Sequence, residues 1–91
     1  MSEEASIDLD CGIANRRITA WLDDELGLPR EDGAWVCFHG RASCRICVEP
    51  LDSRPLGTIL LERTRLVARG DAAAVEAFRK AFTLRFMSAG G

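Results

Sequence analysis

The chain has 91 residues and a net charge of −2, with 47% hydrophobic and 29% charged residues. This length fits one domain with a modest core, and the composition is that of a globular rather than a disordered chain. No apolar run approaches the roughly 20 residues of a membrane span, and the acidic start does not resemble a signal peptide. We therefore expect a single cytoplasmic domain over 1–91, with flexible ends at 1–5 and 88–91.

Charge is divided unevenly along the chain. Residues 1–33 carry nine acidic side chains against three arginines, a net of −6, whereas residues 34–91 carry five against nine basic ones, a net of +4. We expect internal pairing or a charged surface with two faces, the alternative being a basic patch for an anionic partner. The overall negative charge argues against a nucleic-acid partner. Lys80 is the only lysine, and this preference for arginine suggests a GC-rich bacterial genome.

The first elements are predicted as a short strand and a helix. Residues 6–11 alternate polar and apolar side chains, which fits a half-buried strand or an ordered lead-in to the helix that follows. A helix is predicted next, with Asp10 as its N-cap, and Gly27 followed by Pro29 is a typical helix end. Residues 29–33 then form a polar turn. The apolar stripe of the helix consists of Ala14, Ile18, Trp21, Leu22 and Leu26.

Residues 34–49 are predicted to form a β-hairpin around a Gly40-Arg41 loop. A two-residue loop pairs His39 with Ala42, Cys37 with Cys44 and Trp35 with Ile46. Opposed residues share a face of the sheet, so the hairpin directs one apolar set towards the core. That set is Trp35, Cys37, Cys44, Ile46 and Val48.

The second half of the chain is predicted as a turn, a strand and a helix. Residues 52–55 contain Asp, Ser and Pro, which favour a turn. Residues 56–69 follow as a long strand whose apolar phase changes, which requires a bulge near 61–63 or a second short hairpin. Asp71 is then the predicted N-cap of a second helix. The buried face of that helix is formed by Val75, Phe78, Phe82 and Phe86.

Together these elements predict an α+β fold with the order (β)αβββα. We expect a two-layer sandwich in which an antiparallel sheet of three to four strands carries two amphipathic helices on one face.

The cysteines and the single histidine form one candidate site. Cys37, His39, Cys44 and Cys47 lie within eleven residues, and four such ligands can hold zinc. Against this, Cys44 and Cys47 are an odd number of residues apart and point to opposite sides of a regular strand. Core thiols and a cross-strand Cys37–Cys44 disulfide are the alternatives.

Four arginines form a second candidate site. Arg63, Arg65 and Arg69 share one face of the predicted last strand, and Arg45 lies on the face opposite the predicted core. Such a surface would bind an anion or a protein partner, unless it is simply a solvated sheet face. No nucleophile–base–orienter set and no glycine-rich phosphate loop is present, so the sequence does not favour an enzyme.

The chain ends in Gly90-Gly91, which resembles the C-terminus that ubiquitin-like sulfur carriers present for activation. The resemblance covers these two residues and implies C-terminal activation there. Here the tail follows a predicted helix, unless residues 82–86 form a final strand.

From these observations we expect a small non-catalytic domain that binds a protein partner or itself, for example as a homodimer. A Cys/His metal-binding or redox protein is the first alternative, and a sulfur carrier is the second.

Overall fold

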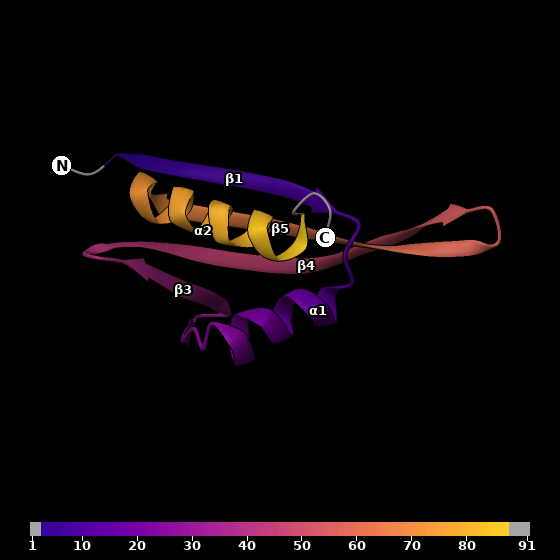
Figure 1. The fold of residues 1–91 in the computed structure, drawn as a ribbon, viewed down its shortest axis with the longest axis horizontal. Coiled ribbons are helices and arrows are strands. Elements are labelled where there is room, and N and C mark those ends of the chain that lie inside the picture. The colour runs from indigo at the N-terminus through magenta and orange to yellow at the C-terminus, as the bar shows by residue number, and fades with distance from the viewer. Residues whose placement is uncertain (1–2, 88–91) are drawn as a thin grey trace.

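The computed structural model describes residues 3–87 and shows an α+β fold with a five-stranded antiparallel sheet (Figure 1). The strands lie in the order β1-β5-β4-β3-β2. The elements are β1 (Glu4–Cys11), α1 (Asn15–Ala20), the π-helical turn η1 (Trp21–Glu25), β2 (Arg30–Glu31), β3 (Ala34–His39), β4 (Ala42–Leu56), β5 (Ile59–Asp71) and α2 (Ala72–Phe86). The prediction of three to four strands missed β2, because only two residues of the expected polar turn pair with β3.

The β3–β4 hairpin is confirmed in its predicted register. Trp35 pairs with Ile46, Cys37 with Cys44, and His39 with Ala42. Gly40 occupies the left-handed conformation that the two-residue loop requires, with φ of 63°. Register follows because a slip by one residue would move every apolar side chain of the hairpin to the opposite face.

The first helix is shorter and wider than predicted. Regular α-helix ends at Ala20, and the Leu26 N–H then donates to the Trp21 carbonyl, a bond that spans five residues. The predicted N-cap at Asp10 is wrong, because Asp10 lies within β1 and the cap position is Ala14. Gly27 does end the segment with a positive φ of 59°.

The core is a single cluster to which the helices and the sheet all contribute. The rings of Phe78, Phe82 and Phe86 on α2 lie 5.4–5.9 Å from the ring of Trp21, in tilted or edge-on arrangements. The predicted α2 face is therefore confirmed, with Phe86 half-buried. Leu26 is the exception in the predicted first stripe, since it is 38% exposed. The strand residues of the core include Trp35, Cys44, Ile46, Leu66 and Ala68.

The predicted turn at residues 52–55 is wrong, because this segment continues β4. The chain turns later, at residues 57–58, so β4 and β5 form a second and longer hairpin. Its register shifts between Leu51 and Arg54, which accommodates the prolines and the change of apolar phase that the sequence shows. The shift lies opposite residues 61–63, where a bulge was one of the two predicted solutions, and β5 is continuous from Ile59 to Asp71.

The end of this hairpin projects from the body of the molecule, as Figure 1 shows. We call residues 50–63 the arm. The Cα radius of gyration is 13.8 Å, whereas a compact chain of this length is expected to have about 12 Å. The arm accounts for this elongation, because it extends along the longest dimension of a molecule measuring 50 × 31 × 23 Å.

Candidate functional site

Three of the four predicted arginines, Arg45, Arg65 and Arg69, line a broad groove of about 860 Å³ on the strands β4 and β5, and Arg63 lies outside it. Arg45, Cys47, Glu49, Arg65, Val67 and Arg69 alternate with core residues along the two strands, and we call the side of the sheet on which they and the groove lie the outer face. Its charges balance, since three arginines and three carboxylates line the groove. The outer face is therefore not a basic patch, and its net charge gives an anion no general attraction. The charged lining residues are Glu4, Arg45, Glu49, Arg65, Arg69 and Asp71.

Two of the four predicted arginines are neutralised by acidic residues. Arg63 pairs with Asp10, and Arg65 pairs with Asp8 at 2.6 Å and with Glu49 at 3.3 Å. Hydrogen bonds from these guanidinium groups lower the pKa of Asp8 and of Asp10 below the usual value for aspartate. The acidic first third of the chain therefore pairs with the basic remainder, as the charge pattern predicts.

The other two arginines face each other directly across β4 and β5. Arg45 and Arg69 are register partners, and like charges in that position repel each other. Arg45 turns away and donates from Nη2 to the Glu31 carbonyl at 2.6 Å. The guanidinium of Arg69 donates no hydrogen bond within residues 3–87, although its charge contributes to lowering the pKa of Asp8. The structure thus separates the predicted group of four into a neutralised pair and an opposed pair.

The cysteines are also divided between the two faces of the sheet. Cys37 and Cys44 are directly opposed, with hydrogen-bonded thiols, while Cys47 is exposed on the outer face. His39 lies at the exposed end of β3. Within residues 3–87 no group of three or more His, Cys, Asp and Glu side chains is arranged to hold a metal ion. The structure therefore brings together two of the four predicted ligands.

The opposed thiols are poorly suited to nucleophilic chemistry. Burial raises the pKa of Cys37 above its usual value, and burial together with the neighbouring Cys37 raises that of Cys44 to about 11. Because the thiolate is the reactive form, both side chains stay protonated and unreactive at neutral pH. Their position on the core face agrees with the predicted role of core thiols.

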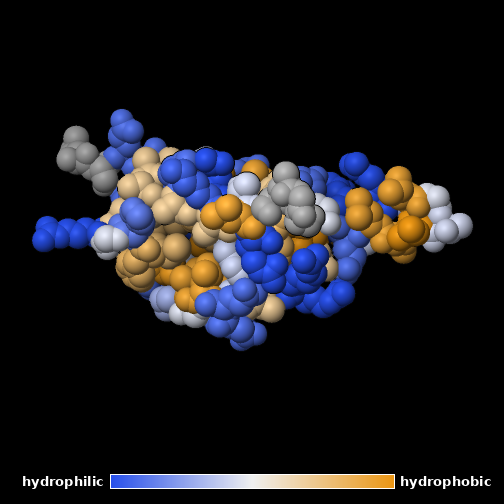
Figure 2. All heavy atoms as spheres, viewed as in Figure 1, coloured by the Kyte–Doolittle hydropathy of each residue, from blue (hydrophilic) through white to orange (hydrophobic). Residues whose placement is uncertain are grey.

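The most unusual surface of the molecule was not among the predicted sites. Leu56, Ile59 and Leu60, at the end of the arm, are 63, 66 and 68% exposed, and the adjacent Leu61 is 38% exposed. Figure 2 shows these apolar side chains gathered at the free end of the arm. Contiguous exposed aliphatic side chains of this size mark an interaction surface more often than isolated ones do.

Within residues 3–87, neither edge of the arm has a neighbouring strand. β3 pairs with β4 only as far as Ile46, and β1 pairs with β5 only from Thr64 onward. A two-stranded ribbon by itself is at best marginally stable in water. The sequence signal for this feature was the Leu56-Gly57-Thr58-Ile59 segment, a glycine-containing two-residue loop between aliphatic residues.

Comparison with known proteins finds no family model, no curated protein and no solved structure that matches the chain. No helix within residues 3–87 is long and apolar enough to cross a membrane. Gly90 and Gly91, the predicted site of C-terminal activation, lie outside the described residues, and the segment that precedes them is the helix α2. What the geometry defines is a small α+β domain with a projecting apolar β-ribbon.

Proposed function

We propose that this chain is a non-catalytic protein-interaction domain that acts in the cytoplasm and contacts its partner with the arm. The observation that carries the proposal is the exposure of Leu56, Ile59 and Leu60 at the end of the arm, where the two strands pair only with each other. Burying one such side chain is worth about 2 kcal/mol. A partner that covers three of them therefore gains more than a typical surface contact provides.

The two faces of the arm support an enclosing rather than a flat contact. In the register of the ribbon, Leu56 and Ile59 point to one face while Pro55 and Leu60 point to the other. A strand that carries apolar residues on both faces is suited to burial on both sides. The partner is accordingly one that surrounds or extends the ribbon.

We further propose that both helices cover the same face of the sheet. In support of this arrangement, Ile18, Trp21 and Phe78 join one core cluster with the inward strand residues Ile46 and Leu66. The helices and the remainder of the sheet then serve as a rigid base from which the arm projects. The charge-balanced outer face remains in solvent or carries a weaker contact.

Photo-crosslinking in the source cells tests this proposal. A photoreactive amino acid is placed at position 60, and in a second variant at position 84, because Leu84 on α2 is a leucine exposed to 74%. We expect one protein, identified by mass spectrometry, to be captured at position 60 and not at position 84. Adding Ile59→Asp should abolish that capture. Equal labelling at both positions, or no protein adduct at position 60, would contradict the proposal.

The alternatives remain predictions with their own tests. A sulfur carrier requires its Gly-Gly end, so removal of Gly90 and Gly91 should abolish C-terminal thiocarboxylate formation. A zinc protein using Cys37, His39, Cys44 and Cys47 should be purified with bound zinc and lose stability in chelator. A chain that is unaffected by truncation and is purified without metal would retain only the interaction hypothesis.

A further inference from the structure

We infer that the partner of the arm is a second copy of this chain, joined edge to edge through β5 of the two arms around a two-fold axis at Leu60. This inference rests on the proposed function, because it identifies the partner of the same surface. It commits to an antiparallel pairing in which Leu60 meets Leu60 of the other copy, Ile59 meets Leu61, and Thr58 meets Glu62.

The backbone of the arm distinguishes its two edges. In an antiparallel hairpin with a two-residue loop, the residues that flank the loop bond to each other, and the next pair turns its backbone groups outward. Here that next pair is Pro55 and Leu60. Proline has no N–H to donate, which blunts the β4 edge, whereas Leu60 presents both an N–H and a C=O on the β5 edge. A new strand is therefore expected to add to β5.

The side chains of β5 are self-complementary in this pairing. Residues 59–61 are Ile-Leu-Leu, so antiparallel pairing around Leu60 places only aliphatic groups opposite one another at these positions. Ile59 and Leu61 meet on one face of the ribbon, and the two Leu60 side chains meet on the other. Because the contact is the same patch on both copies, it closes as a two-fold dimer and does not propagate.

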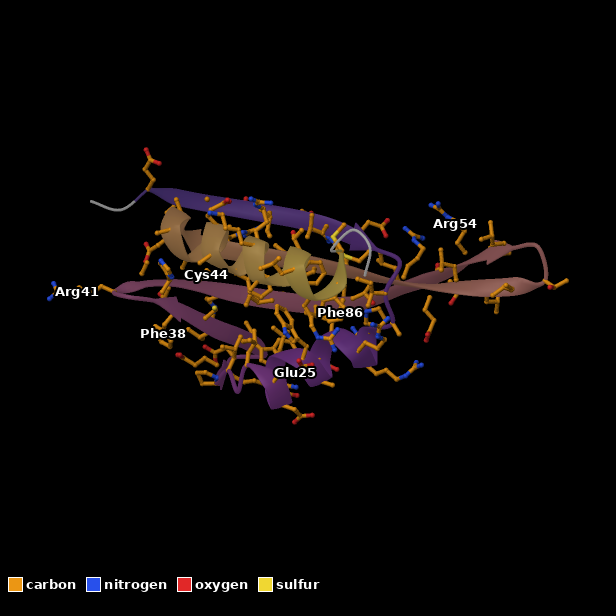
Figure 3. The ribbon with its side chains drawn as sticks, in the orientation of Figure 1. Glu25, Phe38, Arg41, Cys44, Arg54 and Phe86 are labelled. Carbon is orange, nitrogen blue, oxygen red and sulfur yellow. The ribbon has the colours of Figure 1, made fainter. Side chains whose placement is uncertain are left out.

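The charges of the arm agree with a second copy as its partner. Residues 50–63 contain two acidic side chains and two arginines, so two arms approach without net repulsion. Figure 3 shows Arg54 beside the arm, directed away from the ribbon. A neutral arm gives no electrostatic advantage to nucleic acid or to an anionic lipid surface. Pairing of two arms would give a four-stranded ribbon, whereas a two-stranded ribbon alone is only marginally stable in water.

The contact is small, because it consists mainly of the ends of two ribbons. Stable protein interfaces bury about 800 Å² per partner, and contacts below this size are weak or transient. We therefore expect a dimer that dissociates on dilution. Such a dimer is better detected by trapping it covalently than by its survival during chromatography.

Register-specific cysteine trapping tests the inference in the full chain carrying Cys47→Ser, which removes the exposed thiol. Ile59→Cys and Leu61→Cys are prepared separately and then mixed under a mild oxidant, since opposed residues in such a pair lie within disulfide reach. We expect the mixture to form a disulfide dimer at least about tenfold faster than either variant alone. Leu84→Cys, mixed with either variant, is the control that should not form one.

Two outcomes separate this inference from the proposed function. If the mixture forms the disulfide dimer no faster than the single variants or the control, the inference that a second copy is the partner is wrong. If position 60 still captures a different protein in cells in that case, the interaction domain stands with another partner. If neither trapping nor capture occurs at the arm, both proposals fall.

Discussion

Leu56 and Ile59 are directly opposed as the last pair of the β4–β5 ladder, and both are about two-thirds exposed. A pair of large aliphatic side chains across neighbouring strands usually belongs to a core face. Here the pair stands beyond the last residue of β1 and of β3 that pairs with the hairpin. β5 therefore has a buried half, which packs in the core, and an exposed half, which is available for association.

The two halves of β5 should respond differently to the same substitution. Leu66→Ala removes a fully buried side chain and is expected to lower the free energy of unfolding by about 2–5 kcal/mol. Leu60→Ala is the matched control and should change it by less than about 0.5 kcal/mol, because Leu60 is 68% exposed. Urea unfolding followed by tryptophan fluorescence, at a concentration too low for association, measures both. Comparable losses would show that the arm is part of the core.

Gly70 is required for the close approach of β4 and β5. Its φ is 153°, and an added Cβ would lie 2.6 Å from the Cys44 Cα and from the Ser43 carbonyl oxygen. We expect Gly70→Ala to destabilise the fold by about 2 kcal/mol or more, because backbone atoms must move.

Gly12→Ala provides the control for this substitution. A Cβ at Gly12 would meet only Leu61 at 3.7 Å, an ordinary contact. Thermal unfolding should therefore show a clear loss for Gly70→Ala and little change for Gly12→Ala. Equal melting temperatures for the two variants would contradict the observed packing.

Asp23 connects the helical segment to the β2–β3 edge of the sheet. Its carboxylate accepts from Trp35 Nε1 at 2.8 Å and from Arg30 Nη2 at 2.8 Å, and Arg30 also stacks 4.1 Å above the Trp35 ring. Asp23→Ala leaves the indole N–H without this acceptor, and we expect a measurable decrease in the free energy of unfolding. Asp23→Asn retains an acceptor and should cost less. An Asn variant that is as unstable as the Ala variant would contradict a hydrogen-bonding role.

The same carboxylate predicts a decrease of stability in acid. Hydrogen bonds from Arg30 first and Trp35 second lower the pKa of Asp23 below its usual 3.8. This contribution is present above pH 3.8 and is lost as the pH falls through the lower pKa of the folded protein. The pH dependence of unfolding below 3.8 should therefore be shallower in Asp23→Asn than in the parent chain. Identical profiles would exclude Asp23 as a contributor.

Cys44 predicts a decrease of stability at alkaline pH. The pKa of the folded thiol is raised from 9.0 to about 11, so between these values the unfolded thiol is ionised while the folded one keeps its proton. Unfolding then releases a proton, and the free energy of unfolding falls as the pH rises, by on the order of 2–3 kcal/mol.

The composition of the chain makes this effect measurable. The sequence has no tyrosine and one lysine, so the side chains that titrate in this range are chiefly the cysteines, of which Cys11 and Cys37 also have pKa values raised by burial. Cys44→Ala should flatten the decline between pH 9 and 11, as followed by circular dichroism in urea. An unchanged slope in the variant would assign the decline to other groups.

Much of the fold can be predicted because local patterns and sheet register agree. The Gly40-Arg41 loop and the alternation around Cys37 and Cys44 fix one hairpin without any distant information. The aromatic face of α2 follows from spacings of three and four residues in the same way. The charge imbalance also predicts the ion pairs between the two parts of the chain, of which Asp8–Arg65 is one.

The remaining features depend on contacts between segments far apart in sequence. Asp10 has the chemistry of an N-cap, but pairing of β1 with β5 places it beside Arg63 instead. Residues 52–55 have the composition of a turn, yet β4 continues through them and Pro55 is accommodated at the unpaired edge of the arm. How far the arm projects depends on where β1 and β3 stop, which no local pattern encodes.

The most direct test of self-association through the arm is sedimentation equilibrium of the full chain, with Leu60→Asp and Leu84→Asp as a matched pair of variants. We predict that the average mass of the unaltered chain rises with concentration from 10.0 kDa towards twice that value. Leu84→Asp should behave in the same way, and Leu60→Asp should remain at 10.0 kDa. An unaltered chain that stays monomeric up to about 1 mM, where even a dimer with a dissociation constant of about 1 mM would be half-formed, would contradict the account, as would association that Leu60→Asp leaves intact.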